Sequence, residues 1–402
     1  MKGVGMRMNL FIFNELNNDE IIVNLIDFLE NEREESYYAA ARGLIAFSAK
    51  RLTNKSIIKE YALRKALESE GLPDPNSVRD FLRHDVKTIY ETLLRVDWDS
   101  LFLRRGLIPM SAIAAPPADT GLMGYAKSIE SMIEANSKEA LIGAILAHSE
   151  VFGTGETSAY SALRWEKGKL VGIANTDDIS FDDLTGLEHQ KKVLIANTES
   201  FINGKPANDV LLTGSSGTGK SSSVKACLNM FKDRGLRLIE LRKSDLDELT
   251  SVFGRINNPV LKYIIFIDDL SFEPDDMSYK ALKVALDGQA EARGGNVLIY
   301  ATSNRRSLIK ETWSDRDGFS DEVHRNEGLS ERKSLAARFG INLSFLSPTQ
   351  KEYLKIVEDM LKREGFEMSE DIRAKALAWQ TRYNGFSGRS AAQFVSNFLS
   401  ER

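Results

Sequence analysis

The stretch Gly214-Ser215-Ser216-Gly217-Thr218-Gly219-Lys220-Ser221 decides the fold, because it matches the phosphate-loop pattern G-x-x-x-x-G-K-[ST] at every fixed position. Its glycines allow the backbone to turn successive N–H groups inward around phosphate oxygens. A helix that begins near Gly219 adds its positive N-terminal end. We expect Lys220 to reach the β- and γ-phosphates of a nucleotide and the Ser221 hydroxyl to bind Mg²⁺. The predicted nucleotide-binding residues are Gly214, Ser215, Ser216, Gly217, Thr218, Gly219, Lys220, Ser221 and Ser222.

The segments around this loop alternate between strand and helix patterns. A short apolar strand, 209–213, runs into the loop, and a helix, 221–232, follows it. Short apolar strands separated by helices indicate a parallel sheet that is covered on both faces. We therefore expect a three-layer α/β/α core of the P-loop type. The remaining elements predicted for this core are strands at 236–241, 263–267, 296–302 and 341–345 and a helix at 278–290.

Two carboxylates follow the most apolar of these strands. The run Tyr263-Ile264-Ile265-Phe266-Ile267 leads directly into Asp268 and Asp269. An apolar strand that ends in a carboxylate, downstream of a phosphate loop, is the expected partner of Mg²⁺. Asp268 is predicted to hold the metal through water, and Asp269 to polarise the attacking water beside the γ-phosphate. The alternative is that the two acids merely end a strand.

A third polar group follows the strand at 296–302. Tyr300-Ala301-Thr302-Ser303 leads to Asn304, which the parallel sheet would bring to the same edge as the acids. Its amide could hydrogen-bond the γ-phosphate or the attacking water and so sense hydrolysis. An asparagine that only forms a turn is the alternative.

In this order the three features resemble the AAA+ ATPase superfamily, and the resemblance covers roughly residues 178–402. It implies a small helical lid after the core and a position near the adenine for the region of Gly186. The segment 385–391 looks like the second sensor motif of that lid, which implies that Arg389 faces the γ-phosphate.

The segment 334–340 is similar to the AAA+ box that carries an arginine finger, and the resemblance makes Arg338 the candidate finger. Arg316 and Arg325 lie in the same long segment and are alternatives. Arg338 and Arg389 could also be ordinary surface residues.

The sequence departs from the commoner AAA+ pattern at one acid. Most members carry glutamate after the metal-binding aspartate, whereas this chain has Asp269, which is similar to the replication-initiator and helicase-loader branch. The shorter carboxylate leaves Glu273 as a rival for the catalytic base. Over the whole chain, the segments 268–273 and 300–306 resemble a bacterial family of AAA-type ATP-binding proteins with no assigned biological role.

The N-terminal half has helical periodicity. Apolar residues recur at helical spacing over 20–32, 37–52, 56–70, 78–94 and 129–147. The glycine-rich segment 152–156 is expected to be a structural turn, because it lacks the third glycine of a dinucleotide loop. We expect a mainly helical N-terminal domain at 1–175, a P-loop core at 176–347 and a helical lid at 348–402.

Composition excludes several classes of protein. The 402 residues are 42% hydrophobic and 28% charged, which is typical of a folded protein, and the net charge of −5 argues against a protein that coats nucleic acid. The single cysteine, Cys227, excludes an intramolecular disulfide and is expected in the core, and the four scattered histidines make a zinc site unlikely in this pattern. No run of 18 apolar residues is present, so we expect no membrane span and a cytoplasmic protein.

These features predict an ATPase that uses ATP and Mg²⁺ and couples hydrolysis to remodelling of a macromolecular partner. The resemblance implies a homo-oligomer in which Arg338 acts on a neighbouring subunit's nucleotide. The alternative is a slowly hydrolysing, nucleotide-dependent switch or adaptor, which Asp269 motivates. An unknown protein is the favoured partner of the N-terminal half; nucleic acid is possible but not favoured, because the small basic spots at 104–105 and 305–306 suit a solvated surface.

Overall fold

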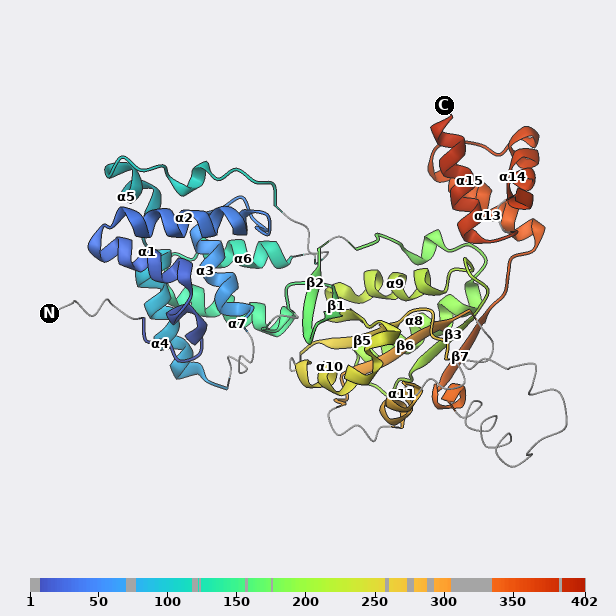
Figure 1. The fold of residues 1–402 in the computed structure, drawn as a ribbon, viewed down its shortest axis with the longest axis horizontal. Coiled ribbons are helices and arrows are strands. Elements are labelled where there is room, and N and C mark those ends of the chain that lie inside the picture. Colours follow the sequence, from blue (N-terminus) through green and yellow to red (C-terminus); the bar gives the residue numbers. More distant parts are fainter. Residues whose placement is uncertain are drawn as a thin grey trace. The chain divides into compact units, whose positions relative to one another are not determined.

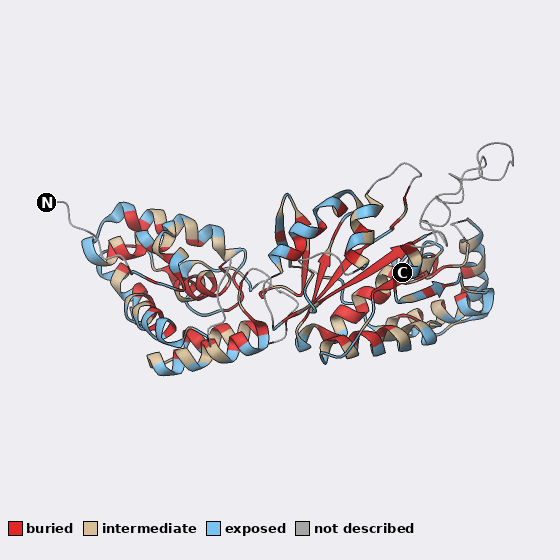
Figure 2. Ribbon diagram, turned by 90° about the horizontal axis from the view of Figure 1, so that it is seen from below, coloured by how far each residue is buried: buried red, intermediate tan, exposed pale blue. Residues whose placement is uncertain are grey.

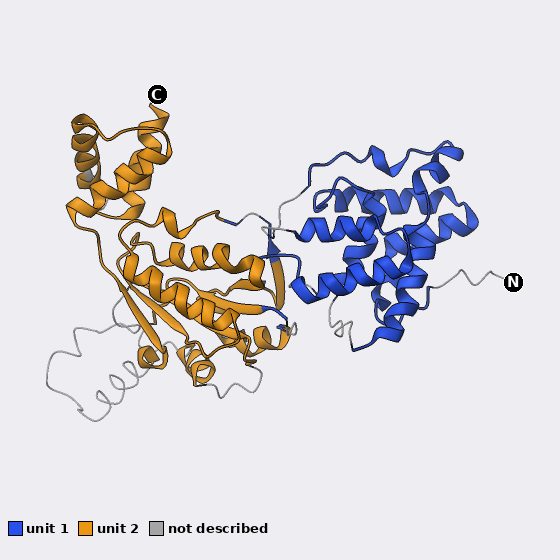
Figure 3. Ribbon diagram, turned by 180° about the vertical axis from the view of Figure 1, so that it is seen from behind, with its two compact units in different colours: residues 1–163, 172–176, 256–261 blue, residues 164–171, 177–255, 262–402 orange. Residues whose placement is uncertain are grey.

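A computed structural model describes the chain over residues 8–69, 77–117, 122, 124–155, 158–174, 176–256, 260–272, 278–287, 293–304, 335–382 and 385–401. Contacts between residues divide the chain into two compact units (Figure 3). The helical unit consists of residues 1–163, 172–176 and 256–261, and the sheet-containing unit consists of residues 164–171, 177–255 and 262–402.

The helical unit has the helices that the sequence predicts, with one exception. The expected helix at 129–147 is two helices. The first ends at Ile133, and Ser137 caps the second by accepting a hydrogen bond from the backbone N–H of Ala140 at 3.1 Å. The helices of this unit are α1 (Glu20–Asn31), α2 (Glu34–Ser48), α3 (Ile57–Leu67), α4 (Arg79–Ile89), α5 (Trp98–Arg104), α6 (Tyr125–Ile133) and α7 (Lys138–Phe152), and a π-helical turn at Tyr90–Leu94 extends α4.

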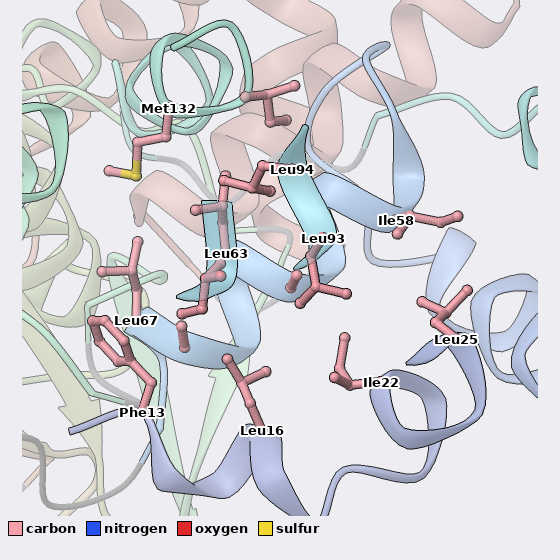
Figure 4. Packing of buried hydrophobic residues seen from close by; sticks show 14 of the residues in the cluster. Phe13, Leu16, Ile22, Leu25, Ile58, Leu63, Leu67, Leu93, Leu94 and Met132 are labelled. Atoms are coloured by element: carbon pink, nitrogen blue, oxygen red, sulfur yellow. The ribbon is translucent and has the colours of Figure 1, made fainter. Parts of the chain in front are cut away.

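One hydrophobic core fills this unit. Figure 4 shows part of it, where leucine and isoleucine side chains from α1, α3 and the turn after α4 converge on Phe13 and Leu16. The fully buried carboxylate of Asp85 accepts hydrogen bonds from the backbone N–H groups of Phe11, Ile12 and Phe13 at 2.7–3.1 Å. These bonds satisfy a charge that would otherwise be costly to bury, and they attach the N-terminal segment to α4.

The second unit is built on a seven-stranded sheet with the order β2-β1-β4-β5-β6-β3-β7. Its five core strands pair in parallel, α8 and α9 cover one face, and α10 and α11 lie on the other (Figure 1). The predicted three-layer α/β/α fold, with a mainly helical region before it, is confirmed. The bounds are α8 (Glu188–Ile202), β3 (Val210–Gly214), α9 (Lys220–Phe231), β4 (Leu236–Glu240), α10 (Leu249–Arg255), β5 (Lys262–Ile267), α11 (Tyr279–Leu286), β6 (Val297–Ser303) and β7 (Ile341–Phe345).

A hairpin at the edge of the sheet was not expected from the sequence. Strands β1 (Ala162–Glu166) and β2 (Lys169–Ile173) are joined by Lys167 and Gly168, both with positive φ (50° and 78°), which is the geometry of a type I′ turn. The strands are short and lie within a helical stretch of sequence, and lysine at the first turn position lacks the usual Asn-Gly signal.

The sheet gives the nearby functional groups a rigid base. Figure 2 shows the central strands, β3 to β6, mostly buried, while the helices that cover them have buried and exposed faces. Strand β3 ends at Gly214, where a Cβ atom would lie 1.9 Å from the carbonyl oxygen of Phe345, so only glycine allows β3 and β7 to approach. Because β3, β5 and β6 are parallel neighbours, the segments after them meet at one edge of the sheet.

Three helices after β7 form the lid region, α13 (Gln350–Arg363), α14 (Glu370–Arg382) and α15 (Gly388–Ser400). They share a small core that includes Tyr353, Val357 and Phe394. Within the described residues, none of the helices in either unit is long and apolar enough to cross a membrane.

Candidate functional site

The phosphate loop turns through three glycines with positive φ. Gly214, Gly217 and Gly219 have φ values of 150°, 77° and 94°, and α9 begins directly after them at Lys220. The Thr218 hydroxyl donates to the carbonyl oxygen of Ser215 at 2.9 Å, which braces the loop from within. This backbone brings the loop and the positive end of α9 together, as binding of phosphate oxygens requires.

Lys220 lies inside the loop. Its Nζ donates to the carbonyl oxygens of Gly214 and Ser215, both at 2.7 Å, and to Oδ1 of Asn304 at 2.9 Å. Burial lowers the pKa of Lys220, and the carboxylates of Asp268 and Asp269 oppose that shift. A partly desolvated ammonium gains more from an anionic partner than an exposed lysine does.

Ser221 and Asp268 form the candidate metal site. The Ser221 hydroxyl donates its proton to Oδ1 of Asp268 at 2.7 Å, so its lone pairs are left to face a cation. These are oxygen donors, which Mg²⁺ prefers, and one or two protein oxygens suffice when a nucleotide supplies others. Within the described part of the chain, no group of three or more His, Cys, Asp or Glu side chains that could hold a metal occurs.

Asp269 and Asn304 are linked beside this pair. The Asn304 amide donates from Nδ2 to Oδ1 of Asp269 at 2.7 Å, while its Oδ1 accepts from Lys220. Asp269 has φ of 53°, a left-handed backbone that costs an aspartate about 1–3 kcal/mol and persists only where the surroundings hold it. Asn304 therefore connects the lysine of the loop to the second acid.

The lid reaches the phosphate loop through the start of α15. The backbone N–H of Gly388 donates to the carbonyl oxygen of Gly217 at 3.0 Å, and Nη1 of Arg389 donates to Oγ of Ser216 at 3.3 Å. A Cβ atom on Gly217 would lie 3.1 Å from Cβ of Arg389, so the absence of a side chain permits this approach. The lid also contacts the segment before α8 through Arg363, which pairs with Asp183 at 2.8 Å.

These groups line one cleft of about 1210 Å³ between the core and the lid of the sheet-containing unit. The polar end contains the loop from Ser216 to Ser222 and both acids, with Asn304 and Arg389. The cleft also includes Gly186, in the region that the resemblance assigns to the adenine, and the ion pair of Asp183 and Arg363. Its apolar lining residues are Ile179, Leu184, Leu187, Leu346, Ile356 and Met360.

Arg338 does not line this cleft. Its Nε donates to Oδ1 of Asp287, the residue that caps α11, at 2.5 Å, and both side chains are about one quarter exposed. Glu273, Arg305, Arg306, Arg316 and Arg325 lie outside the described residues.

One residue that joins these groups, Thr302, was not expected from the sequence. Its side chain is buried, and its hydroxyl donates to Oδ1 of Asp268 at 2.5 Å and accepts from the backbone N–H of Asp269 at 2.9 Å. A threonine within an apolar strand is an ordinary strand residue by pattern. The only available signal was its place two residues before Asn304, at the end of a strand that adjoins the acids.

Cys227 is a buried core residue on α9, as expected. The hydroxyl of Thr198 lies 3.7 Å from its sulfur, and burial raises the pKa of the thiol to about 12. A thiol in this state is unreactive at neutral pH.

A family model and several solved structures are similar to this chain, and none of them gives it a role. The model of a family described as "Protein of unknown function (DUF815)" matches residues 158–402. No curated protein matches the chain.

Similar solved structures include an AAA domain of FIGL-1 in complex with ADP, with 20% identity and a TM-score of 0.38 over 54% of this chain and 71% of that one. The ORC1 protein of Aeropyrum pernix in complex with DNA has 17% identity and a TM-score of 0.40 over 55% of this chain and 61% of its own. AMPPCP-bound DnaA of Aquifex aeolicus has 18% identity and a TM-score of 0.39 over 56% of this chain and 66% of its own. These values are too low to carry an activity or a partner to this chain.

Proposed function

The chain belongs to the family described as "Protein of unknown function (DUF815)", and the matched residues include all those that line the cleft. Since that family has no assigned function, we propose one from the residues of the cleft. The proposed function is Mg²⁺-dependent hydrolysis of ATP. One observation carries the proposal. Lys220, Ser221 and Asp268, with Asp269 and Asn304, come from the ends of three neighbouring strands and line the same cleft.

The polar end of the cleft would bind the triphosphate. Loop amides and Lys220 would bind the β- and γ-phosphates, and Lys220 would exchange its loop carbonyl partners for phosphate oxygens. Ser221 and Asp268 would hold Mg²⁺, which would offset negative charge on the phosphates. Apolar residues that line the cleft, among them Leu187 and Met360, suit the base of the nucleotide.

Asp269 would then orient the attacking water and accept its proton. Water attacks the γ-phosphorus, the bond to the bridging oxygen breaks, and the products are ADP, inorganic phosphate and a proton. Asn304 is hydrogen-bonded to Asp269 and could respond to loss of the γ-phosphate. Arg389 reaches the loop at Ser216 and could add positive charge near the same phosphate.

We further propose that the chain works as a homo-oligomer. Arg338 lies outside the cleft of its own subunit, which suits a finger that acts on a neighbour's nucleotide. Hydrolysis would be coupled to remodelling of a macromolecular partner bound by the helical unit, and the net charge of −5 favours a protein over nucleic acid.

A slowly hydrolysing switch is the second candidate. Asp269 is one methylene shorter than glutamate, and the Asn304 amide already engages one of its oxygens, which disfavours rapid proton transfer. Steady-state turnover at a protein concentration that favours assembly separates the two candidates. Fast turnover without any partner contradicts the switch, whereas tight ATP binding with almost no turnover supports it.

The test of nucleotide binding is Lys220→Ala. We expect loss of binding of a fluorescent ATP analogue and loss of phosphate release, because the replacement removes the buried ammonium at the centre of the loop. Lys205→Ala is the matched control, since Lys205 is an exposed lysine of the same unit outside the cleft. Normal binding and turnover in Lys220→Ala would contradict the site assignment.

A further inference from the structure

We propose that Thr302 is a positioning residue that sets the geometry of both acids, so that binding of Mg²⁺ with the nucleotide depends on its hydroxyl. The proposal rests on the proposed function of the same cleft. Thr302 lies near the end of β6, is 1% exposed, and pairs with Leu212 of β3 in the sheet. Its position is therefore fixed by the centre of the sheet rather than by a surface loop.

The direction of each hydrogen bond at this hydroxyl follows from its partners. The backbone N–H of Asp269 can only donate, so the Thr302 oxygen accepts that bond at 2.9 Å. The single hydroxyl proton is then directed to Oδ1 of Asp268 at 2.5 Å. One hydroxyl thus bridges the side chain of the first acid and the backbone of the second.

For Asp268 the consequence is a fixed carboxylate. Its Oδ1 accepts from two hydroxyls, those of Thr302 and Ser221, and no described residue binds its Oδ2. The two donors hold the carboxylate plane and leave Oδ2 to face the cation or its water. Without Thr302, rotation of the carboxylate would be opposed only by Ser221, which must itself serve the cation.

For Asp269 the consequence is a fixed backbone. Its φ of 53° lies in the left-handed region, and the bond from its N–H to Thr302 supports that conformation. The next residue is attached to the same threonine, because the backbone N–H of Leu270 donates to the carbonyl oxygen of Thr302 at 2.7 Å. Replacing the side chain of Thr302 removes the first bond and keeps the second.

The experiment compares Thr302→Val, which keeps the shape and removes the hydroxyl, with Thr302→Ser, which keeps the hydroxyl. Binding of a fluorescent, non-hydrolysable ATP analogue is measured first in EDTA and then along a Mg²⁺ titration. We expect binding in EDTA to stay within about twofold for both variants. The Mg²⁺ concentration at half-maximal effect should rise about 10-fold or more in Thr302→Val, the usual range for loss of a residue that orients a ligand, and return toward normal in Thr302→Ser.

A matched control and a second variant keep the test decisive. Thr198→Val makes the same change at another buried threonine, on α8 and outside the cleft, and should leave the Mg²⁺ titration unchanged. If Thr302→Val does not fold, Thr302→Cys, with a weaker donor of similar size, should shift the titration in the same direction.

Two outcomes separate this proposal from the proposed function. If the unaltered protein binds the analogue in a Mg²⁺-dependent manner and Thr302→Val gives the same titration, the positioning role is wrong and the ATPase proposal stands. If the unaltered protein shows no Mg²⁺-dependent binding, the proposed function fails and the role of Thr302 fails with it.

Discussion

At the scale of residues, two charged groups in the cleft, Lys220 and Asp268, are held by neutral partners. Lys220 is held by two loop carbonyls and by Asn304, and Asp268 is held by two hydroxyls. Neutral partners orient a charge without cancelling it, so the charges remain able to act on a ligand. The charged residues are therefore already oriented before a ligand binds.

Asp269→Asn tests the role of the second acid. The replacement has almost the same shape but cannot accept a proton, so we expect ATP binding to change little and turnover to fall by about 10²–10⁴. Phosphate release and binding of a fluorescent analogue are measured on the same samples. Asp247→Asn, at an exposed aspartate outside the cleft, is the control.

Normal turnover in Asp269→Asn would contradict this role. If Asp269→Asn keeps normal turnover, the catalytic base is another group, and Glu273→Gln should then lower turnover while Asp269 serves only to bind.

At the scale of elements, the lid and the phosphate loop meet where Gly217 approaches the start of α15. A Cβ atom added to Gly217 would lie 3.1 Å from Cβ of Arg389, which is closer than an ordinary van der Waals contact. The hydrogen bond from Gly388 to Gly217 links the two elements. In the proposed function, this contact would couple nucleotide binding to the position of the lid.

Gly217→Ala tests that coupling. Alanine would be strained at φ of 77°, by about 1–2 kcal/mol, and would also push α15 away from the loop. We expect nucleotide affinity to fall at least 10-fold. Gly365→Ala is the matched control, because Gly365 has φ of 81° in the lid but a Cβ atom added there would meet no other atom within 4 Å.

Both glycine variants should lose a similar amount of stability in thermal unfolding, since both carry the same backbone strain. Equal nucleotide affinities in the two variants would mean that crowding against Arg389 has no part in binding.

At the scale of the whole molecule, the proposed finger Arg338 would have to act on the nucleotide of a neighbouring subunit. It pairs with Asp287 on the sheet-containing unit and does not line the cleft there. Turnover by isolated chains should therefore be slow and should rise with protein concentration.

Mixing two inactive variants tests action between subunits. Lys220→Ala lacks a working cleft and Arg338→Ala lacks a working finger, so each alone should be inactive, with Arg338→Ala reduced by about 10³–10⁵. A mixture should recover phosphate release, because Lys220→Ala subunits supply Arg338 to intact clefts.

Arg234→Ala replaces an arginine that pairs with Glu199 away from the cleft, and it should retain full turnover without mixing. If Arg338→Ala binds nucleotide normally and turns over normally by itself, Arg338 is not the finger. In that case Arg316 and Arg325 become the candidates.

The sequence by itself determined the local features of this protein. Strand, helix and phosphate loop are specified by residues within a few positions of one another, through apolar spacing and the positive φ that glycine allows. This is why the strands from β3 to β7 and the phosphate loop that begins at Gly214 could be predicted. The hairpin β1–β2 could not, because its pattern is short and its pairing is with a distant strand.

Only the tertiary structure decided which distant side chains meet. Arg389 and Ser216 are 173 residues apart, Thr302 and Asp268 are 34 apart, and Arg338 pairs with an acid 51 positions away. Such contacts depend on the order and register of the strands and on how the lid packs, which no short pattern encodes. For that reason the motif at Lys220 could be recognised in the sequence, whereas the hydroxyl that orients both acids could not.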